Sequence, residues 1–179
     1  SPTITAVTNN GPIGEGSSVT ITVTASDAAG ANDPLQYEFD CNNDAVYEIG
    51  PQASDSASCT FADNGSFPVP VRVSDGDGGV DTDSTTVTVQ NLPPTITAVT
   101  NNGPIDEGSN ATITVTATDP AGANDPLRFE FDCNNDAVYE IGPQASNSAS
   151  CTFTDNENFA VAVRVSDGGG GVDTDSTTV

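Results

Sequence analysis

The chain has 179 residues, of which 26 are acidic and 3 are basic, and its formal net charge is −23. Such a polyanion cannot neutralise phosphates, which excludes nucleic acids and anionic membrane surfaces as partners. The absence of histidine excludes imidazole bases and imidazole zinc ligands. No apolar run approaches the roughly 20 residues that span a bilayer, and no signal peptide opens the chain. We therefore expect no membrane insertion in this segment, and any export signal or anchor outside it.

The sequence repeats itself after 92 residues. Residues 2–87 align with residues 94–179, and 72 of the 86 aligned positions are identical. A period this long exceeds the roughly 20 to 50 residues of a solenoid unit, so it indicates tandem copies of a whole domain. The copies meet at Asn91-Leu92-Pro93-Pro94, a short joint stiffened by proline. We expect one domain over residues 1–91 and a second over residues 92–179.

Each copy shows the pattern of an all-β fold. Val19, Ile21 and Val23 alternate with threonines, which is typical of a half-buried strand, and no stretch has helical spacing. Between turns rich in glycine, asparagine and proline, the first copy has predicted strands over residues 3–8, 18–26, 35–40, 45–49, 57–61, 67–74 and 81–90. Seven short strands in roughly 90 residues predict an antiparallel β-sandwich of the immunoglobulin type. Pro68 and Pro70 lack backbone N–H groups, which predicts a bulge or an unpaired edge in strand 67–74.

Two cysteines occur in each copy at the same spacing, Cys41 with Cys59 and Cys133 with Cys151. Of the three possible pairings, a disulfide within each domain is favoured because the repeat reproduces both positions. Free buried thiols are the alternative, whereas a zinc site is disfavoured by the lack of histidine and of any C-x-x-C motif. Disulfides indicate an oxidising, extracellular compartment.

One acidic cluster follows the predicted strand 35–40. Oxygen-bearing side chains occupy positions 1, 3, 5 and 9 of this segment, as Asp40, Asn42, Asp44 and Glu48, and again as Asp132, Asn134, Asp136 and Glu140. This spacing is typical of a calcium loop, although the glycine and the bidentate glutamate of a full EF-hand are absent.

Other acidic and amide side chains in the remaining loops also recur in both copies. They are Asp27, Asn32, Asp33 and Asp75, then Asp119, Asn124, Asp125 and Asp167, together with Glu15 and Glu107 in glycine-rich turns. Gly169 replaces Asp77 in the second copy. Sandwich topology predicts two poles, one with Glu15, the Asp40 segment and Asp63, and the other with Asp27, Asn32, Asp33, Asp75, Asp77 and Asp81.

Carboxylates gathered at one pole need a counter-ion. Two of them about 6 Å apart repel by about 3 kcal/mol at an effective dielectric of 20. Calcium takes six to eight oxygens from carboxylates, carboxamides and carbonyls, so it is the cofactor that we expect at these residues. The alternative is that the same residues are solvated turn formers on an acidic, soluble surface.

The copies resemble polycystic kidney disease (PKD) repeats and related bacterial immunoglobulin-like repeats. The resemblance covers each copy and is carried by the segments PTITAV, GPIGEGSSVTITVTASD, LQYEFDCNNDAVYEIG and FPVPVRVSDGDGGVDTDSTTVTV. The arrangement of Glu15, the Asn91 linker, Asp119, Asn124, Asp125 and Asp167 is also similar to cadherin joints, where calcium rigidifies successive domains. The resemblance implies two tandem β-sandwich domains of an extracellular, multi-domain, structural or adhesive protein.

The sequence is compatible with three functions. The leading hypothesis is a structural, calcium-binding repeat in a stiff rod or fibre whose partners are copies of itself, arranged head to tail. The second is a carbohydrate- or protein-binding module of a secreted enzyme, which the lack of tryptophan and the presence of only three tyrosines disfavour. The third is catalysis by paired carboxylates, which is disfavoured because these residues stand in near-identical copies. We therefore expect no enzyme activity.

Overall fold

The computed structural model describes all 179 residues. The chain divides into two compact units, Ser1–Gln90 and Asn91–Val179, and each is an all-β sandwich of two sheets. No helix in the structure has the length and apolar run that a membrane crossing requires.

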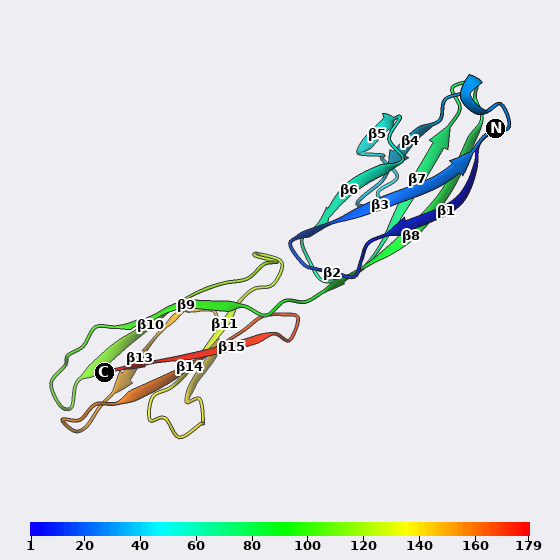
Figure 1. Ribbon diagram of the computed structural model, residues 1–179. Coiled ribbons are helices and arrows are strands. Elements are labelled where there is room, and N and C mark those ends of the chain that lie inside the picture. Colours follow the sequence, from blue (N-terminus) through cyan, green and yellow to red (C-terminus); the bar gives the residue numbers. More distant parts are fainter. The chain divides into compact units, whose positions relative to one another are not determined.

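Unit 1 contains eight strands and one short 3-10 helix (Figure 1). They are β1 (Thr3–Asn9), β2 (Ile13–Gly14), β3 (Ser17–Ser26), η1 (Gly30–Asn32), β4 (Gln36–Phe39), β5 (Ile49–Gln52), β6 (Ser56–Phe61), β7 (Gly65–Ser74) and β8 (Val80–Gln90). One sheet has the order β1-β3-β6 and the other the order β2-β8-β7-β4-β5. All pairs are antiparallel except β2 with β8.

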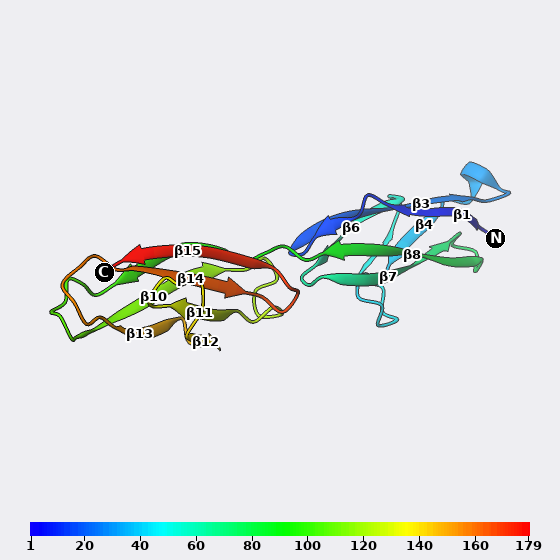
Figure 2. The same cartoon turned by 90° about the horizontal axis from the view of Figure 1, so that it is seen from below.

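Unit 2 repeats this arrangement without a counterpart of β2. Its strands are β9 (Thr95–Asn101), β10 (Asn110–Thr118), β11 (Arg128–Asp132), β12 (Ile141–Gln144), β13 (Ser148–Thr152), β14 (Ala160–Ser166) and β15 (Val172–Thr178). One sheet has the order β13-β10-β9 and the other β12-β11-β14-β15. Figure 2 shows β15, β14 and β11 side by side in the second of these sheets.

The core lies between the two sheets of each unit, as the alternation of apolar residues predicts. In unit 1, Val19, Ile21 and Val23 of β3 are buried in a cluster with Val71 of β7 and Phe39 of β4. The intervening residues of β3 point outward because successive side chains of a strand alternate between faces. The immunoglobulin-like sandwich predicted from the sequence is therefore confirmed.

The predicted strand 45–49 is wrong. Only Ile49 is extended, as the first residue of β5, and residues 45–48 belong to a loop. The carboxylate of Asp40 stabilises this loop, because it accepts hydrogen bonds from the backbone N–H groups of Asp44 and Ala45. The two-residue strand β2 is too short to give a periodic signal, and the sequence does not predict it.

The paired prolines produce an unpaired edge rather than a bulge. The pairing of β7 with β8 runs from Gly65 to Ser74 without a register shift, whereas the pairing of β4 with β7 stops at Val71. Pro70 accepts a hydrogen bond from Asp40 but has no N–H group to return one. In unit 2, Ala162 replaces Pro70, and β11 pairs one residue further than β4 does.

Both disulfides are formed within their own domains. Cys41 is bonded to Cys59 and Cys133 to Cys151, with Cα–Cα distances of 5.5 and 5.6 Å. This confirms the favoured pairing and leaves no free thiol. Each disulfide joins the first residues of an acidic loop to a buried position in the opposite sheet, on β6 or β13.

Candidate metal centres

Residues 40–48, which we name the acidic loop, connect β4 to β5 in unit 1. Asp40 is buried at its start, and its two oxygens accept N–H groups from Asp44 at 3.2 Å and Ala45 at 2.9 Å. Asp40, Asp44 and Glu48 each offer one carboxylate oxygen, and these three atoms lie within 4.8 Å of one another. The loop therefore brings three negative charges to one point.

The backbone of the acidic loop turns as a calcium loop does. The sixth position, where EF-hands have glycine, is Ala45, and its φ of 69° lies in the left-handed region. Asn42 Oδ1 accepts the N–H of Asp44 at 3.0 Å, and Glu48 Oε2 accepts that of Cys41 at 2.8 Å. A carboxylate oxygen has two lone pairs, so these bonds fix the side chains and still leave each of them able to bind a cation.

Unit 2 builds the same loop from residues 132–140. Asp132 is buried and accepts the N–H groups of Asp136 at 3.2 Å and Ala137 at 2.8 Å. Asp132, Asp136 and Glu140 again offer oxygens within 4.8 Å, and the amide of Asn134 donates to Asp136 at 3.1 Å. The donor set contains only oxygen and carries three negative charges, which suits calcium better than a transition metal.

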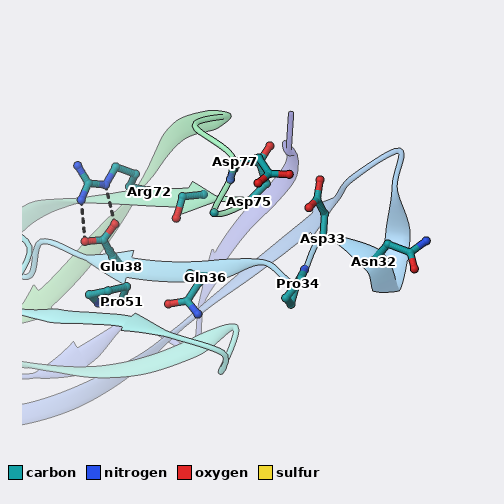
Figure 3. A pocket seen from close by; sticks show the side chains of 11 residues that line it. Asn32, Asp33, Pro34, Gln36, Glu38, Pro51, Arg72, Asp75 and Asp77 are labelled. Atoms are coloured by element: carbon teal, nitrogen blue, oxygen red, sulfur yellow. Dashed lines mark hydrogen bonds and ion pairs between the residues drawn. The ribbon is translucent and has the colours of Figure 1, made fainter.

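An arginine joins the acidic loop to the sheet behind it. In unit 1, Nε and Nη2 of Arg72 on β7 donate to the buried Glu38 on β4 at 2.6 and 2.7 Å (Figure 3). The same guanidinium lies 4.7 Å from the centre of the Tyr47 ring, within the loop. The hydrogen bond that Arg72 donates to Glu38 raises the pKa of Arg72 above its ordinary value. The guanidinium thus connects β4, β7 and the acidic loop.

Unit 2 repeats this contact, which the sequence alone does not predict. Arg164 bonds Glu130 at 2.6 and 2.7 Å and lies 4.5 Å from the centre of the Tyr139 ring. Two of the three basic residues of the chain are therefore used to hold an acidic loop against its sheet.

Replacing Arg72 with methionine should lower the free energy of unfolding by about 2 kcal/mol, because the buried Glu38 then loses its charged hydrogen-bond partner. Calcium affinity should also fall, since Tyr47 is no longer held. Urea unfolding measures the first effect. Arg128→Met is the control, because Arg128 is exposed and makes no ion pair, and its effect should stay within about 0.5 kcal/mol. Equal effects of the two changes would show that the contact has no role.

A second acidic group lies beside the N-terminal residue of unit 1. The ammonium group of Ser1 is 3.1 Å from Asp27 Oδ2 and 3.6 Å from Asp75 Oδ2, and these two side chains are only 3% and 4% exposed. The other oxygen of each carboxylate accepts a backbone N–H of its own loop. Asp27 accepts that of Ala29, and Asp75 accepts that of Gly79. A hydrogen bond from Ala29, followed by the ammonium, lowers the pKa of Asp27. The two carboxylates therefore lie close enough together to contact the same positive charge.

Asp33 lies close to the same carboxylates. Burial is the largest cause that raises the pKa of Asp33 above its ordinary value. The negative charges of Asp77, Asp75 and Asp27 raise this pKa further. Figure 3 shows Asp33, Asp75 and Asp77 along one open groove, whereas Asn32 points away from Asp75 and Asp77. Four carboxylates therefore stand near one another with one ammonium group among them.

The corresponding group in unit 2 contains buried oxygens that accept no hydrogen bond. Asp119 uses Oδ1 to accept the N–H of Ala121 at 2.8 Å, and its buried Oδ2 accepts none. Asp119 and Asp125 offer carboxylate oxygens within 4.8 Å of each other. Asn91 donates to Asp167 at 3.1 Å, while its own buried Oδ1 accepts no hydrogen bond. Buried oxygens without donors are costly unless a cation binds them.

The difference between the copies at position 169 follows from this packing. A side chain added at Gly169 would overlap the amide of Asn91. Unit 1 has Asp77 at the equivalent position, where it can lie in the groove beside Asp33.

Three of the remaining predicted ligands lie on the surface, and the fourth is buried. Asn32 and Asn124 are exposed, and Asn32 donates to its own turn at the carbonyl of Ala29. Glu15 is buried with its backbone N–H bonded to Gln90, and Glu107 is exposed. Neither Glu15 nor Asp63 belongs to the three-carboxylate group of the acidic loop. Asp81, expected at the other pole, accepts the backbone N–H of Ile4 at 2.7 Å and so ties β8 to β1.

Asp33→Asn should stabilise the fold in the presence of a chelator. Because the folded-state pKa of Asp33 is raised, its ionisation opposes folding, and this cost grows as the pH rises above the ordinary pKa of an aspartate. The melting temperature of the variant should therefore exceed that of the parent at pH 7, and the gain should shrink towards pH 4. In calcium the variant should instead melt below the parent if Asp33 is a calcium ligand, because the exchange removes that ligand. The control is Asp83→Asn, an exposed carboxylate that bonds only the N–H of Ser84; an equal gain there would contradict the account.

Comparison with known proteins identifies the family of the first domain. Residues 1–89 match the family model of the PKD domain. The second copy, with 72 of 86 aligned positions identical to the first, repeats that domain. The chain is a tandem pair of PKD-like domains.

Solved structures with the same fold come from distant proteins. An amphioxus IgVJ-C2 molecule is 14% identical with a TM-score of 0.54, over 93% of this chain and 97% of that one. The insect immune protein hemolin is 13% identical with a TM-score of 0.53, over 98% of this chain, which spans about half (46%) of hemolin. These likenesses show an immunoglobulin-like fold for the PKD pair and nothing more. No curated protein sequence matches the chain.

Proposed function

We propose that this PKD pair is a calcium-binding structural repeat of an extracellular fibre. The observation that carries the proposal is the acidic loop, in which Asp40, Asp44 and Glu48 offer oxygens within 4.8 Å on a backbone that turns at Ala45. Unit 2 reproduces the whole arrangement. Calcium at these loops neutralises part of a net charge of −23 that otherwise opposes close association of copies.

Two further features support a structural role outside the cell. The two disulfides are stable in oxidising, extracellular compartments, and PKD-like and immunoglobulin-like domains are typical of extracellular adhesion or binding proteins. The near-identity of the copies favours a repeating array, because a contact made by one copy is available to the next. The short Asn91-Leu92-Pro93-Pro94 joint favours stiffness over a flexible tether.

The carboxylates serve binding better than catalysis. Those of the acidic loops accept backbone N–H groups that hold the loop closed, and they stand in two near-identical copies. A general acid needs a carboxyl group kept protonated next to a substrate cleft, whereas two of the three carboxylates in each acidic loop are exposed.

Electron microscopy of the assembled material, with and without chelator, tests the fibre. We expect beaded filaments whose persistence length falls when calcium is removed. Isolated two-bead particles, or filaments that are indifferent to chelation, would overturn the proposal.

A further inference from the structure

One sheet of each domain carries no charged residue. None of the 26 acidic and 3 basic residues of the chain lies in β1, β3 or β6 of unit 1, or in β9, β10 or β13 of unit 2. All the charge lies in the opposite sheets, in the loops and in the turns. The nearest charged neighbour of β6 along the chain is Asp55 in the preceding turn, and unit 2 has Asn147 there.

The outer surface of this sheet is covered with hydroxyl groups. In unit 1, Thr20 and Thr24 of β3 are exposed, with Ser58 of β6 opposite Thr20 in the register. The hydroxyls of Ser18 and Thr60 are 2.7 Å apart, and Thr5 donates to the carbonyl of Thr24 at 3.1 Å. We name this outer surface the hydroxyl face.

Unit 2 preserves the hydroxyl face with its contacts. Thr112 and Thr116 of β10 are exposed, the hydroxyl of Thr152 donates to Asn110 at 2.7 Å, and Thr97 donates to the carbonyl of Thr116 at 3.1 Å. The substitution of Asn110 for Ser18 therefore keeps both the hydrogen bond and the neutrality of the face.

Strand propensity explains the threonines but not the missing charges. Threonine favours β-strands, and the opposite sheet of unit 1 also exposes threonines, such as Thr86 on β8. That sheet nevertheless carries Glu38, Arg72, Asp81 and Asp83 on its strands. Two outward-facing sheets of one domain thus differ in charge, and both copies keep the difference.

We infer that the hydroxyl face is the docking surface for a second copy of this chain. At a net charge of −23, two copies that approach through their loops or their charged sheets repel each other. Two hydroxyl faces meet without placing like charges opposite one another, which would cost several kcal/mol. Threonine supplies a methyl group for contact and a hydroxyl for hydrogen bonds.

The hydroxyl face contains none of the proposed calcium ligands, so this docking goes beyond the proposed function and can fail or succeed separately. It also makes an unusual prediction about salt. Because the contact itself is neutral and the rest of the surface repels, added sodium chloride screens the repulsion and should strengthen association. A contact made of ion pairs would weaken under the same change.

Sedimentation velocity of the full chain over a range of concentrations tests the inference. One variant carries Thr20→Asp and Thr112→Asp, at the centre of the hydroxyl face in both units. The matched control carries Thr86→Asp and Thr178→Asp, which are exposed positions on the charged sheets. Both variants gain the same two charges.

The parent should self-associate more strongly at high than at low sodium chloride, in chelator as well as in calcium. The hydroxyl-face variant should associate at least tenfold more weakly, and the control should behave as the parent does. A parent that stays monomeric throughout, or two variants that change equally, would overturn the inference. Binding of a monomeric parent to cellulose that is lost only in the hydroxyl-face variant would assign the face to a neutral polysaccharide and also overturn it.

Discussion

Exchanging Asp40 and Asp132 for asparagine should abolish most of the stabilisation that calcium gives at the acidic loops. A single site at about 100 times its dissociation constant adds about 2.7 kcal/mol to the free energy of unfolding. Each exchange removes a buried carboxylate that both orders its loop and contributes an oxygen to the three-carboxylate group. Urea unfolding of the variant in calcium and in chelator measures the loss.

The control for this experiment removes the same charge elsewhere. Asp63 and Asp155 hold equivalent positions in the two copies, and each bonds the N–H of the residue that follows it. Asp63→Asn with Asp155→Asn should retain the calcium-dependent stabilisation. If both double variants lose it to the same extent, the effect is one of net charge and the acidic loops are not the sites.

Removing the disulfide of unit 1 by Cys41→Ala and Cys59→Ala should cost that domain about 3 kcal/mol in the chain-entropy account, given a sequence separation of 18 residues. Calcium affinity should fall as well, because Cys41 is the second residue of the acidic loop and its N–H holds Glu48. Urea unfolding and a calcium titration measure the two effects.

Comparison with the untouched disulfide of unit 2 completes this test. The loss of stability should appear only in the unfolding transition of unit 1. The unfolding transition of unit 2 should still shift to higher urea when calcium is added. A variant with unchanged stability would contradict the role given to Cys41–Cys59. A destabilised variant with unchanged calcium affinity would show that the disulfide does not position the loop.

The sandwich was predictable because its signals are local. Val19, Ile21 and Val23 alternate with polar residues, and the turns between strands are rich in glycine, asparagine and proline. The same locality made the acidic cluster predictable, since its oxygen-bearing side chains lie within nine residues. The error over residues 45–49 arose because apolar Val46 and aromatic Tyr47 suggest a strand, whereas hydrogen bonds to Asp40 fix a loop.

Features that depend on residues far apart in sequence were not predictable from one chain. Glu38 and Arg72 are 34 residues apart, and only the pairing of β4 with β7 makes them neighbours. The N–H of Ile4 donates to Asp81 across 77 residues, and only the fold brings these two residues of β1 and β8 together. One signal was available in the sequence, which is that both copies keep an arginine at this position in a chain with only three basic residues.

Thermal unfolding of the parent chain in chelator, in millimolar calcium and in millimolar magnesium tests the central claim most directly. One occupied site per domain should raise the melting temperature in calcium by about 10 °C or more, since 1 kcal/mol shifts a domain of this size by about 4–8 °C. Magnesium should restore little of this, because it demands a tighter octahedral geometry than a loop of this kind provides. Equal melting temperatures in calcium and in chelator would contradict the account.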